Sequence, residues 1–202
     1  MFCTHPTILA EGEATGEVPN PAESSAKYQR LISILREAFQ SGERALVYTS
    51  YTRMIELLAR DLPQRLGCRL DSIYGGVAPE KRQESVDALN DSRLDMLVLN
   101  PQAGGTGLNI TGANHVIHYN LEWNPATVDK ATARAHRRGQ DRPVFVHYLY
   151  YANTVEEVIL QRLQRKRDLA DLAVKGVDGE SLETTDIMHA LALSPLSEEV
   201  PS

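Results

Sequence analysis

The segment MLVLNPQAGGTGLN, residues 96–109, joins a short apolar run to a loop with three glycines. The run over residues 96–100 is apolar at every position but the last, which predicts a strand buried on both faces of a sheet. Such a strand is typical of a parallel sheet, since helical crossovers cover both faces of one. The glycines either form a tight turn or let the backbone approach a phosphate closely, and the loop alone leaves both interpretations open.

The same alternation of strands and amphipathic helices extends along most of the chain. Compact or alternating apolar runs predict further strands over residues 45–49, 69–74, 115–120 and 144–150. Apolar residues at three- and four-residue spacing predict a first helix that begins at Ala26 and stops before Gly42. The same spacing predicts further helices over residues 52–62, 79–90, 125–138 and 154–174. Pro63 is expected to end or interrupt the second of these helices. The pattern predicts an α/β fold, a parallel sheet with helices on both faces, whose ligands bind at the carboxyl ends of the strands.

Composition places the chain among globular proteins and excludes several classes. The 202 residues suffice for one domain of ordinary size, and no apolar run is long enough to span a bilayer, so we expect no membrane partner. Cys3 and Cys68 stand far apart, which argues against a disulfide framework and against a zinc site. We therefore expect no metal centre and an intracellular location, in a bacterial nucleoid or a nucleus.

Charge is distributed unevenly along the sequence. The net charge is −6, yet all 21 Lys and Arg lie within residues 27–175, against 17 acidic residues there. Residues 1–26 carry four acids and residues 176–202 carry six, and neither segment contains a Lys or Arg. The middle of the chain is therefore mildly basic, which permits contact with phosphates without requiring it.

The stretch ARAHRRGQ, residues 133–140, holds two arginines three residues apart. On the expected helix, Arg134 and Arg137 point from one face, where they form either a solvated surface or an anion site. Guanidinium groups bind phosphate oxygens in a fork, and such an arginine finger can be supplied to a nucleotide by a separate domain. The sequence lacks both G-x-x-x-x-G-K-[ST] and the dipeptide Asp-Glu, so we expect no nucleotide hydrolysis by this chain alone.

Several segments, in chain order, resemble motifs of the second RecA-like lobe of Swi/Snf-type ATPases, the DNA translocases of helicase superfamily two. They are SSAKYQRLISIL (24–35), ALVYTSYT (45–52), IYGG and the arginine that follows it (73–82), AGGTGLN (103–109), EWNP (122–125) and RAHRRGQ (134–140). CTHP (3–6) resembles the segment before the lobe, and TVEEVILQRLQRKRDL (154–169) resembles the brace helix behind it. The resemblance implies a RecA-like lobe that works together with an N-terminal RecA-like lobe of the same protein.

The resemblance also implies roles for individual residues. Arg134 and Arg137 would reach the γ-phosphate of ATP, which the first lobe would hold with Mg²⁺, so no cofactor is expected on this chain alone. Three further residues would lie at the nucleotide cleft: Gly105, Gly107 and Lys130. Five residues would contact double-stranded DNA, mostly through phosphates: Ser50, Arg82, Gly104, Thr106 and Trp123. For Trp123, an indole packed in the core is the equal alternative. A DNA-bound protein substrate is a further implied partner.

The sequence departs from the family pattern at two motifs. Asn100-Pro101-Gln102 stands where the family has Ser-Thr-Arg, which removes a cationic contact, and Lys130 and Ala133 replace Gln and Asp in the arginine motif. We expect four segments: a leading segment and flexible loop, the lobe, the brace helix, and an acidic, largely disordered tail, at residues 1–25, 26–152, 153–175 and 176–202. The alternative function is a non-enzymatic DNA- or protein-binding module.

Overall fold

The computed structural model describes residues 25–103 and 107–174, with side chains up to residue 166. Its strands are β1 (Ala45–Tyr48), β2 (Leu70–Ile73), β3 (Met96–Leu99), β4 (His115–His118) and β5 (Phe145–Tyr148). Its helices are α3 (Ala26–Gln40), α4 (Thr52–Leu66), α5 (Pro79–Asn90), α6 (Pro125–Thr132) and α7 (Val155–Val174). The leading segment and expected loop up to residue 24, the three loop residues 104–106 and the acidic tail lie outside the described residues.

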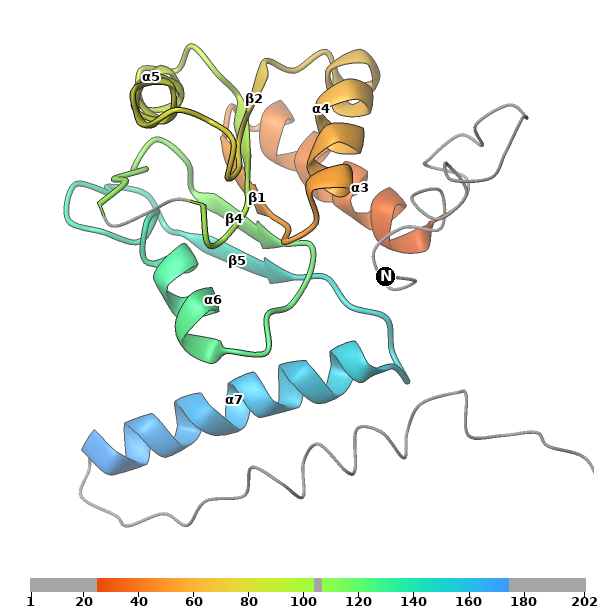
Figure 1. Ribbon diagram of the computed structural model, residues 1–202, viewed down its shortest axis with the longest axis vertical. Helices are drawn as coiled ribbons and strands as arrows, with labels where there is room; N and C mark the ends of the chain where they lie inside the picture. The colour runs from red at the N-terminus through yellow and green to blue at the C-terminus, as the bar shows by residue number, and fades with distance from the viewer. Residues whose placement is uncertain (1–24, 104–106, 175–202) are drawn as a thin grey trace, which may run out of the picture.

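The five strands form one sheet in the order β2-β3-β1-β4-β5, and every neighbouring pair is parallel. Helices α3 and α4 cover one face of this sheet, and α5 and α6 cover the other (Figure 1). The predicted parallel α/β sandwich is therefore confirmed. The central strands β1 and β3 are fully buried, as their uninterrupted apolar sequences require.

Helix α3 begins where the sequence provides a cap. Ser25 Oγ accepts a hydrogen bond from the Tyr28 amide at 3.2 Å, which satisfies one of the free donors of the first turn. The face of α3 that carries Leu31 and Leu35 packs into the core, and both side chains are fully buried. Gly42, in the left-handed region at φ 70°, turns the chain toward β1.

Pro63 neither ends nor interrupts α4, which continues to Leu66. Proline costs the helix one hydrogen bond, yet Leu62 is fully buried and Leu66 packs against the same core cluster. The left-handed Gly67 closes the helix, and its amide donates to Pro63 O at 3.0 Å. Burial of this last turn therefore outweighs the lost bond.

The expected helix over 125–138 is too long, because α6 ends at Thr132. Beyond that residue the amides make turn bonds, such as Ala135 N to Thr132 O at 3.1 Å, and the segment also bonds to other parts of the chain. Arg134 O accepts from the Ile110 amide at 3.0 Å. The Gln140 side chain donates to two carbonyls of the 111–113 segment at 2.8 and 2.9 Å. The two arginines therefore lie in turns after the helix, and the prediction that they share one helix face is wrong.

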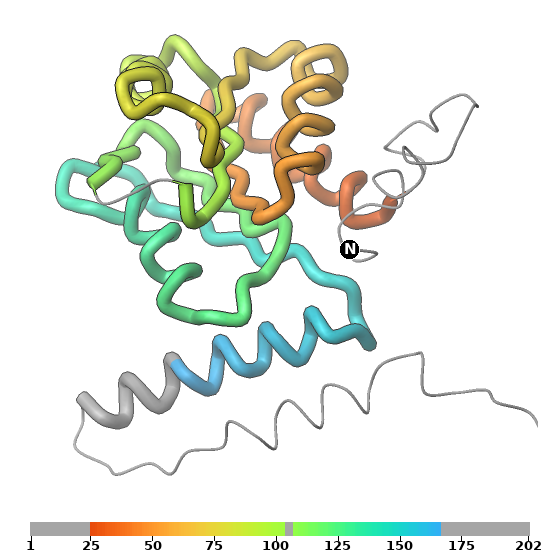
Figure 2. The backbone as a smooth tube through the Cα atoms, viewed as in Figure 1, coloured from red at the N-terminus to blue at the C-terminus, as the bar shows by residue number. Residues whose placement is uncertain are grey.

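Helix α7 follows β5 and crosses beneath the α6 end of the lobe (Figure 2). Its Ile159 and Leu163 pack against Leu121 and Val128, of which the first precedes α6 and the second belongs to it. Within the two described ranges, no helix is long and apolar enough to cross a membrane.

Candidate functional site

Polar side chains at the carboxyl ends of the strands tie three loops together. Thr49 Oγ1, directly after β1, donates to Asn120 Oδ1 after β4 at 2.7 Å, and this bond is buried. Asn100 Nδ2, directly after β3, donates to Ser50 O at 3.3 Å. Ligands of parallel α/β sheets bind at this edge, so the cross-linked loops form a rigid base for the candidate site.

The turn into α6 presents an exposed aromatic ring. Trp123 is 48% exposed, so the alternative of an indole packed in the core is wrong. Asn124 caps the helix by accepting from the Ala126 amide at 3.0 Å, and Pro125 occupies the first turn, where its missing N–H costs nothing. The ring is thus carried by a fixed turn and is accessible.

Ser50 lies beside this turn and donates its hydroxyl hydrogen to Glu122 Oε1. Burial raises the pKa of the Glu122 carboxyl. The serine hydroxyl is engaged within the protein, and a DNA contact by Ser50 stays a prediction.

Arg134 is half-buried, and its guanidinium contacts the loop after β3. Its Nη2 donates to Pro101 O, in the loop after β3, at 3.3 Å. The charge of Arg134 also lies close enough to Tyr48, at the end of β1, to oppose the rise that burial causes in the pKa of this tyrosine. These neighbours place Arg134 at the carboxyl ends of two central strands.

Arg137 differs from Arg134 because it is exposed. Only its backbone is fixed by the turn: its amide donates to Ala135 O at 3.1 Å, and its carbonyl accepts from the Gln140 amide at 3.0 Å. The two arginines therefore differ: the Arg134 guanidinium is hydrogen-bonded to the loop after β3, and the Arg137 side chain is exposed to solvent.

Arg82 does not extend from the surface. Its guanidinium donates to three carbonyls, those of Val77 at 2.7 Å, Ala103 at 2.6 Å and Gly75 at 3.3 Å. The side chain therefore braces the start of the glycine loop against the turn between β2 and α5. Its predicted contact with DNA stays a prediction, and the observed contacts show a structural use of the same group.

The other predicted residues have fewer described contacts. Gly107 has φ 118°, which an L side chain rarely adopts, so a turn requires glycine here. Lys130 is exposed on α6. Three of the predicted residues lie outside the described part of the chain: Gly104, Gly105 and Thr106.

Two buried side chains at the same edge were missed by reasoning from sequence. Tyr48 and His118 end β1 and β4 and contact the last turn of α6. The sequence offered one signal for them: the last residue of each of these two adjacent strands has an aromatic ring with a polar atom. The same pattern also occurs in hydrophobic cores that bind no ligand. Among the described residues, no group of three His, Cys, Asp or Glu side chains is arranged to hold a metal ion.

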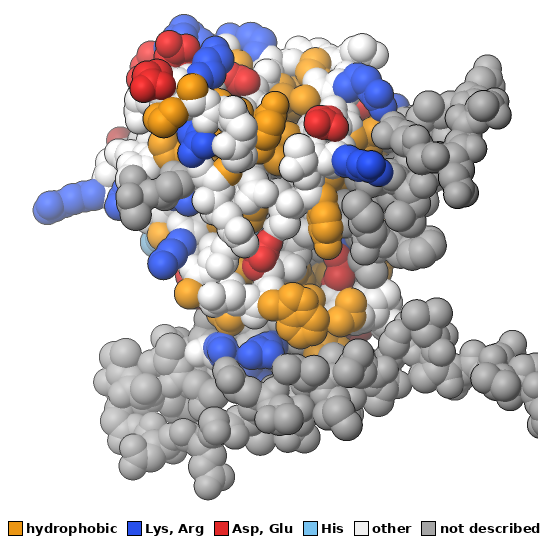
Figure 3. All heavy atoms as spheres, in the orientation of Figure 1, with side chains coloured by type: hydrophobic (Ala, Val, Ile, Leu, Met, Phe, Trp, Pro, Cys, Tyr) orange, Lys and Arg blue, Asp and Glu red, His pale blue; other side chains and the backbone are white. Residues whose placement is uncertain are grey.

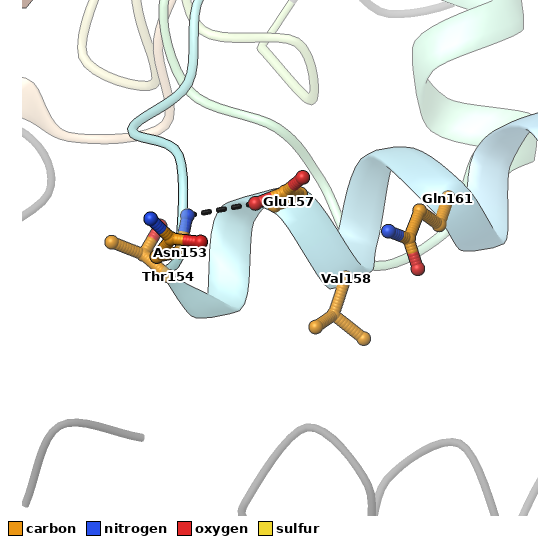
Figure 4. Close-up of a pocket in the computed structure, with 5 residues that line it drawn as sticks. All are labelled: Asn153, Thr154, Glu157, Val158 and Gln161. Atoms are coloured by element: carbon orange, nitrogen blue, oxygen red, sulfur yellow. Dashed lines mark hydrogen bonds between the residues drawn. The ribbon is translucent and has the colours of Figure 1, made fainter. Parts of the chain in front are cut away.

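Two other surfaces are poorer candidates. A hollow on α7 is lined by Asn153, Thr154, Glu157, Val158 and Gln161, and the Asn153 amide donates to Glu157 Oε2 at 2.7 Å (Figure 4). Its lining has no cationic side chain to hold a phosphate. On the face shown in Figure 3, Lys and Arg are interspersed with acidic and apolar groups rather than gathered into a stripe.

Residues 26–139 match the model of the helicase conserved C-terminal domain. The chain belongs to this family. The matched segment includes the glycine loop, α6 and both arginines, so the helicase domain assignment covers the whole candidate site. The RecA-like fold expected from the sequence is thereby confirmed.

Relatives of this helicase domain are of the SWI2/SNF2 type. The protein YwqA of Bacillus subtilis is 33% identical over 195 residues, which are 96% of this chain and 21% of YwqA. Helicase swr1 of Aspergillus fumigatus is 38% identical over 82% of this chain and 10% of its own length. The chain thus spans about a fifth or less of these relatives.

Solved structures give the same result. The Sulfolobus solfataricus SWI2/SNF2 ATPase core in complex with double-stranded DNA is 31% identical, with a TM-score of 0.66 over 83% of this chain and 34% of that one. The chain thus carries a helicase C-terminal domain of the SNF2-type helicase/translocase family, as the sequence motifs indicated.

Proposed function

We propose that this domain is the second lobe of an ATP-dependent translocase on double-stranded DNA. In this proposal Arg134 and Arg137 act as arginine fingers toward ATP held by a first lobe, and the domain has no turnover alone. The placement of Arg134 carries the proposal: its Nη2 donates to Pro101 O, in the loop after β3, at the strand ends where ligands of such sheets bind. A guanidinium that served only to solvate a surface would not need this anchoring.

The residues present fit a nucleotide phosphate better than a metal ion. The guanidinium groups of Arg134 and Arg137 match phosphate oxygens in shape and charge. Gly107 allows the loop backbone to turn beside them, and Lys130 is exposed on the neighbouring helix. Mg²⁺ would accompany ATP on the first lobe, because the described residues contain no suitable cluster of ligands.

DNA contact is proposed at the same edge. Trp123 is exposed on a fixed turn, and the SWI2/SNF2 relative of known structure was solved with double-stranded DNA. Contacts by residues such as Trp123 would be to phosphates and groove walls, which carry little sequence information. DNA-bound proteins, in a nucleoid or a nucleus, would be the load that such a motor moves.

Helix α7 would act as a brace in this proposal. Helix α7 contacts Leu121, which precedes α6, and Val128, which lies within α6. The two arginines follow the end of α6. We therefore divide the chain into a lobe over residues 26–152 and a brace over 153–175, between the leading segment 1–25 and the tail 176–202.

The test is DNA-stimulated ATP hydrolysis. The chain is assayed alone and then joined to a first lobe that carries G-x-x-x-x-G-K-[ST], with and without double-stranded DNA. We expect no turnover alone and DNA-stimulated turnover when joined. Arg134→Ala and Arg137→Ala should each lower kcat by a factor of about 10³–10⁵. The control is Arg138→Ala, which removes an adjacent exposed arginine. Unchanged kcat in both finger variants contradicts the proposal.

A second candidate function is a DNA- or protein-binding module without turnover. The absent phosphate-binding loop favours it for the chain as given. Trp123 is the single tryptophan, so its fluorescence during a titration with duplex DNA reports binding directly. DNA binding together with no turnover in the joined protein would favour this second function.

A further inference from the structure

Glu122 accepts the single hydrogen of the Ser50 hydroxyl. The glutamate lies in the turn between β4 and α6, and Ser50 lies in the loop after β1, 72 residues earlier in the chain. The hydroxyl donates to Glu122 Oε1, and both residues are half-buried. The contact therefore joins the two loops that carry Ser50 and Trp123, two of the residues proposed to contact DNA.

The fold favours the neutral form of Glu122. Burial raises the pKa of its carboxyl group, and among the described residues no neighbouring charge contributes to this rise. The carboxyl groups of Glu43 and Asp95 show the opposite. Hydrogen bonds from His115 and Arg69 hold the pKa values of these two groups below their usual range. Glu122 thus lacks the cationic partner that keeps a carboxylate charged.

One hydroxyl hydrogen cannot serve two anions. A DNA phosphate in contact with Ser50 would need the hydrogen that Glu122 accepts, because a hydroxyl has a single donor. An ionised Glu122 would also repel that phosphate, since both groups would lie within hydrogen-bond reach of the same oxygen. A protonated carboxyl group removes both conflicts. Its own O–H can donate to Ser50 Oγ, and Ser50 then directs its hydrogen to the phosphate.

The position of Glu122 puts it inside the proposed DNA surface. Trp123 is the next residue and is 48% exposed, and Asn124 fixes the turn by accepting from the Ala126 amide at 3.0 Å. On the other side of the contact, Asn100 Nδ2 donates to Ser50 O at 3.3 Å. Hydrogen bonds thus hold the backbone on both sides, so a ligand that reaches Trp123 also meets the Ser50–Glu122 contact.

We propose that Glu122 limits the affinity of this domain for DNA, and that DNA binds the form in which Glu122 has taken a proton from solvent. The charged form occupies the Ser50 hydroxyl and repels phosphates. The neutral form passes a hydrogen bond through Ser50 to one of them. The inference rests on the proposed function, since it needs DNA at this edge of the sheet.

The first experiment measures affinity against pH. The full chain is titrated into a fluorescein-labelled duplex of about 20 base pairs at fixed salt, and anisotropy gives Kd. Glu122→Gln removes the charge and keeps an N–H that can donate to Ser50, so it imitates the protonated acid. We expect this variant to bind about 10-fold more tightly than the wild-type chain at about pH 8, and the difference to shrink toward about pH 5.5. Equal Kd values for the two proteins across this range overturn the inference.

The matched control is Glu157→Gln. Glu157 is half-buried like Glu122, and its Oε2 accepts a hydrogen bond from the Asn153 amide at 2.7 Å, at the start of α7. This variant makes the same change of charge away from Ser50, so it should keep the wild-type Kd at every pH. An equal gain in both variants would mean that the lower overall negative charge caused it, and would overturn the inference.

Ser50→Ala tests whether the two anions share one hydrogen. In this background Glu122→Gln should gain at most about 2-fold in affinity, because the hydroxyl for which carboxylate and phosphate compete is gone. The two changes are therefore expected to be non-additive. A full gain of about 10-fold in the Ser50→Ala background would mean that Glu122 acts without Ser50, and would overturn the inference.

A second measurement needs no variant. Calorimetric titration of the wild-type chain with the same duplex, in buffers that differ in ionisation enthalpy, gives the number of protons taken up on binding. We expect uptake that approaches about one proton in part of the range from about pH 5.5 to 8. Binding without proton uptake at every pH overturns the inference even if a variant fails to fold.

The same titrations separate the two proposals. If the wild-type chain and Glu122→Gln bind the duplex with the same Kd and the same pH dependence, the role of Glu122 is wrong and the DNA contact stands. If neither protein binds the duplex at low salt, alone or joined to a first lobe, the proposed DNA contact is wrong and the role of Glu122 falls with it.

Discussion

A buried ion pair joins the two ends of the described fold. Lys27, in the first turn of α3, and Glu156, in the first turn of α7, lie 129 residues apart in sequence, with Nζ 2.5 Å from Oε1. Their side chains are 1% and 7% exposed. The ammonium group also lies 5.3 Å from the centre of the Tyr119 ring and 5.4 Å from that of Tyr151. The second carboxylate oxygen accepts from the Tyr151 amide at 3.0 Å.

Removing one charge should be far more costly than removing both. Glu156→Gln removes the carboxylate that pairs with the buried Lys27 ammonium, and breaking a buried pair in this way costs about 3–5 kcal/mol. The two aromatic rings offset about 1–2 kcal/mol of this cost, so we expect a net loss of about 2–4 kcal/mol. Lys27→Met combined with Glu156→Leu removes both charges and should regain most of that loss, because apolar groups of similar volume fill the site.

The assay is equilibrium urea unfolding, followed by far-ultraviolet circular dichroism and by Trp123 fluorescence. Glu84→Gln is the control, because the Lys81–Glu84 pair is 59% and 69% exposed with its atoms 3.5 Å apart. This control should change stability by less than about 1 kcal/mol. If Glu156→Gln behaves like the control, or if the double variant is no more stable than the single one, the reasoning is refuted.

Two further predictions concern close packing and pH. Gly112→Ala would place a Cβ 2.6 Å from the Asn90 Cα, so it should destabilise the chain by about 1–3 kcal/mol. Gly75→Ala, with nothing within 4 Å, should stay within about 0.5 kcal/mol of wild type by urea unfolding. Burial, with the nearby charges of His115 and Arg30, lowers the pKa of His147 below 6.5, so the unfolded chain binds the proton more readily. Stability should therefore fall as pH is lowered below about 6.5, and His147→Gln should flatten this slope between about pH 7.5 and 5.5; identical slopes would contradict the assignment.

Local sequence determined the elements whose causes are local. Strands β1 and β3 are short apolar runs that only a two-sided core accommodates, and both are fully buried. Helix α3 begins at the Ser25 cap, and α5 spans the predicted residues Pro79 to Asn90. Strands that alternate with helices leave little choice except a parallel sheet, so the fold and the edge that carries the candidate site were predictable. The order of the motifs along the chain was likewise sufficient to indicate the helicase family.

Tertiary structure alone decided how the candidate site is arranged. Arg134 and Arg137 belong to a pattern that continues a helix, yet α6 stops at Thr132. Arg134 O accepts from the distant Ile110 amide, and the peptide groups of Arg137 bond within the turn that follows α6. Arg82 uses its donors on backbone carbonyls, and α4 passes through Pro63 because its last turn is buried.

The physical reason is the same in each case. Each contact depends on a partner outside its own helix or strand: Ala103 lies 21 residues from Arg82, and Glu156 lies 129 residues from Lys27. The periodicity or spacing of residues within one segment cannot predict such a partner. The sequence therefore specified which helices and strands form. Their packing decided which charged groups are bonded within the protein and which can contact a ligand.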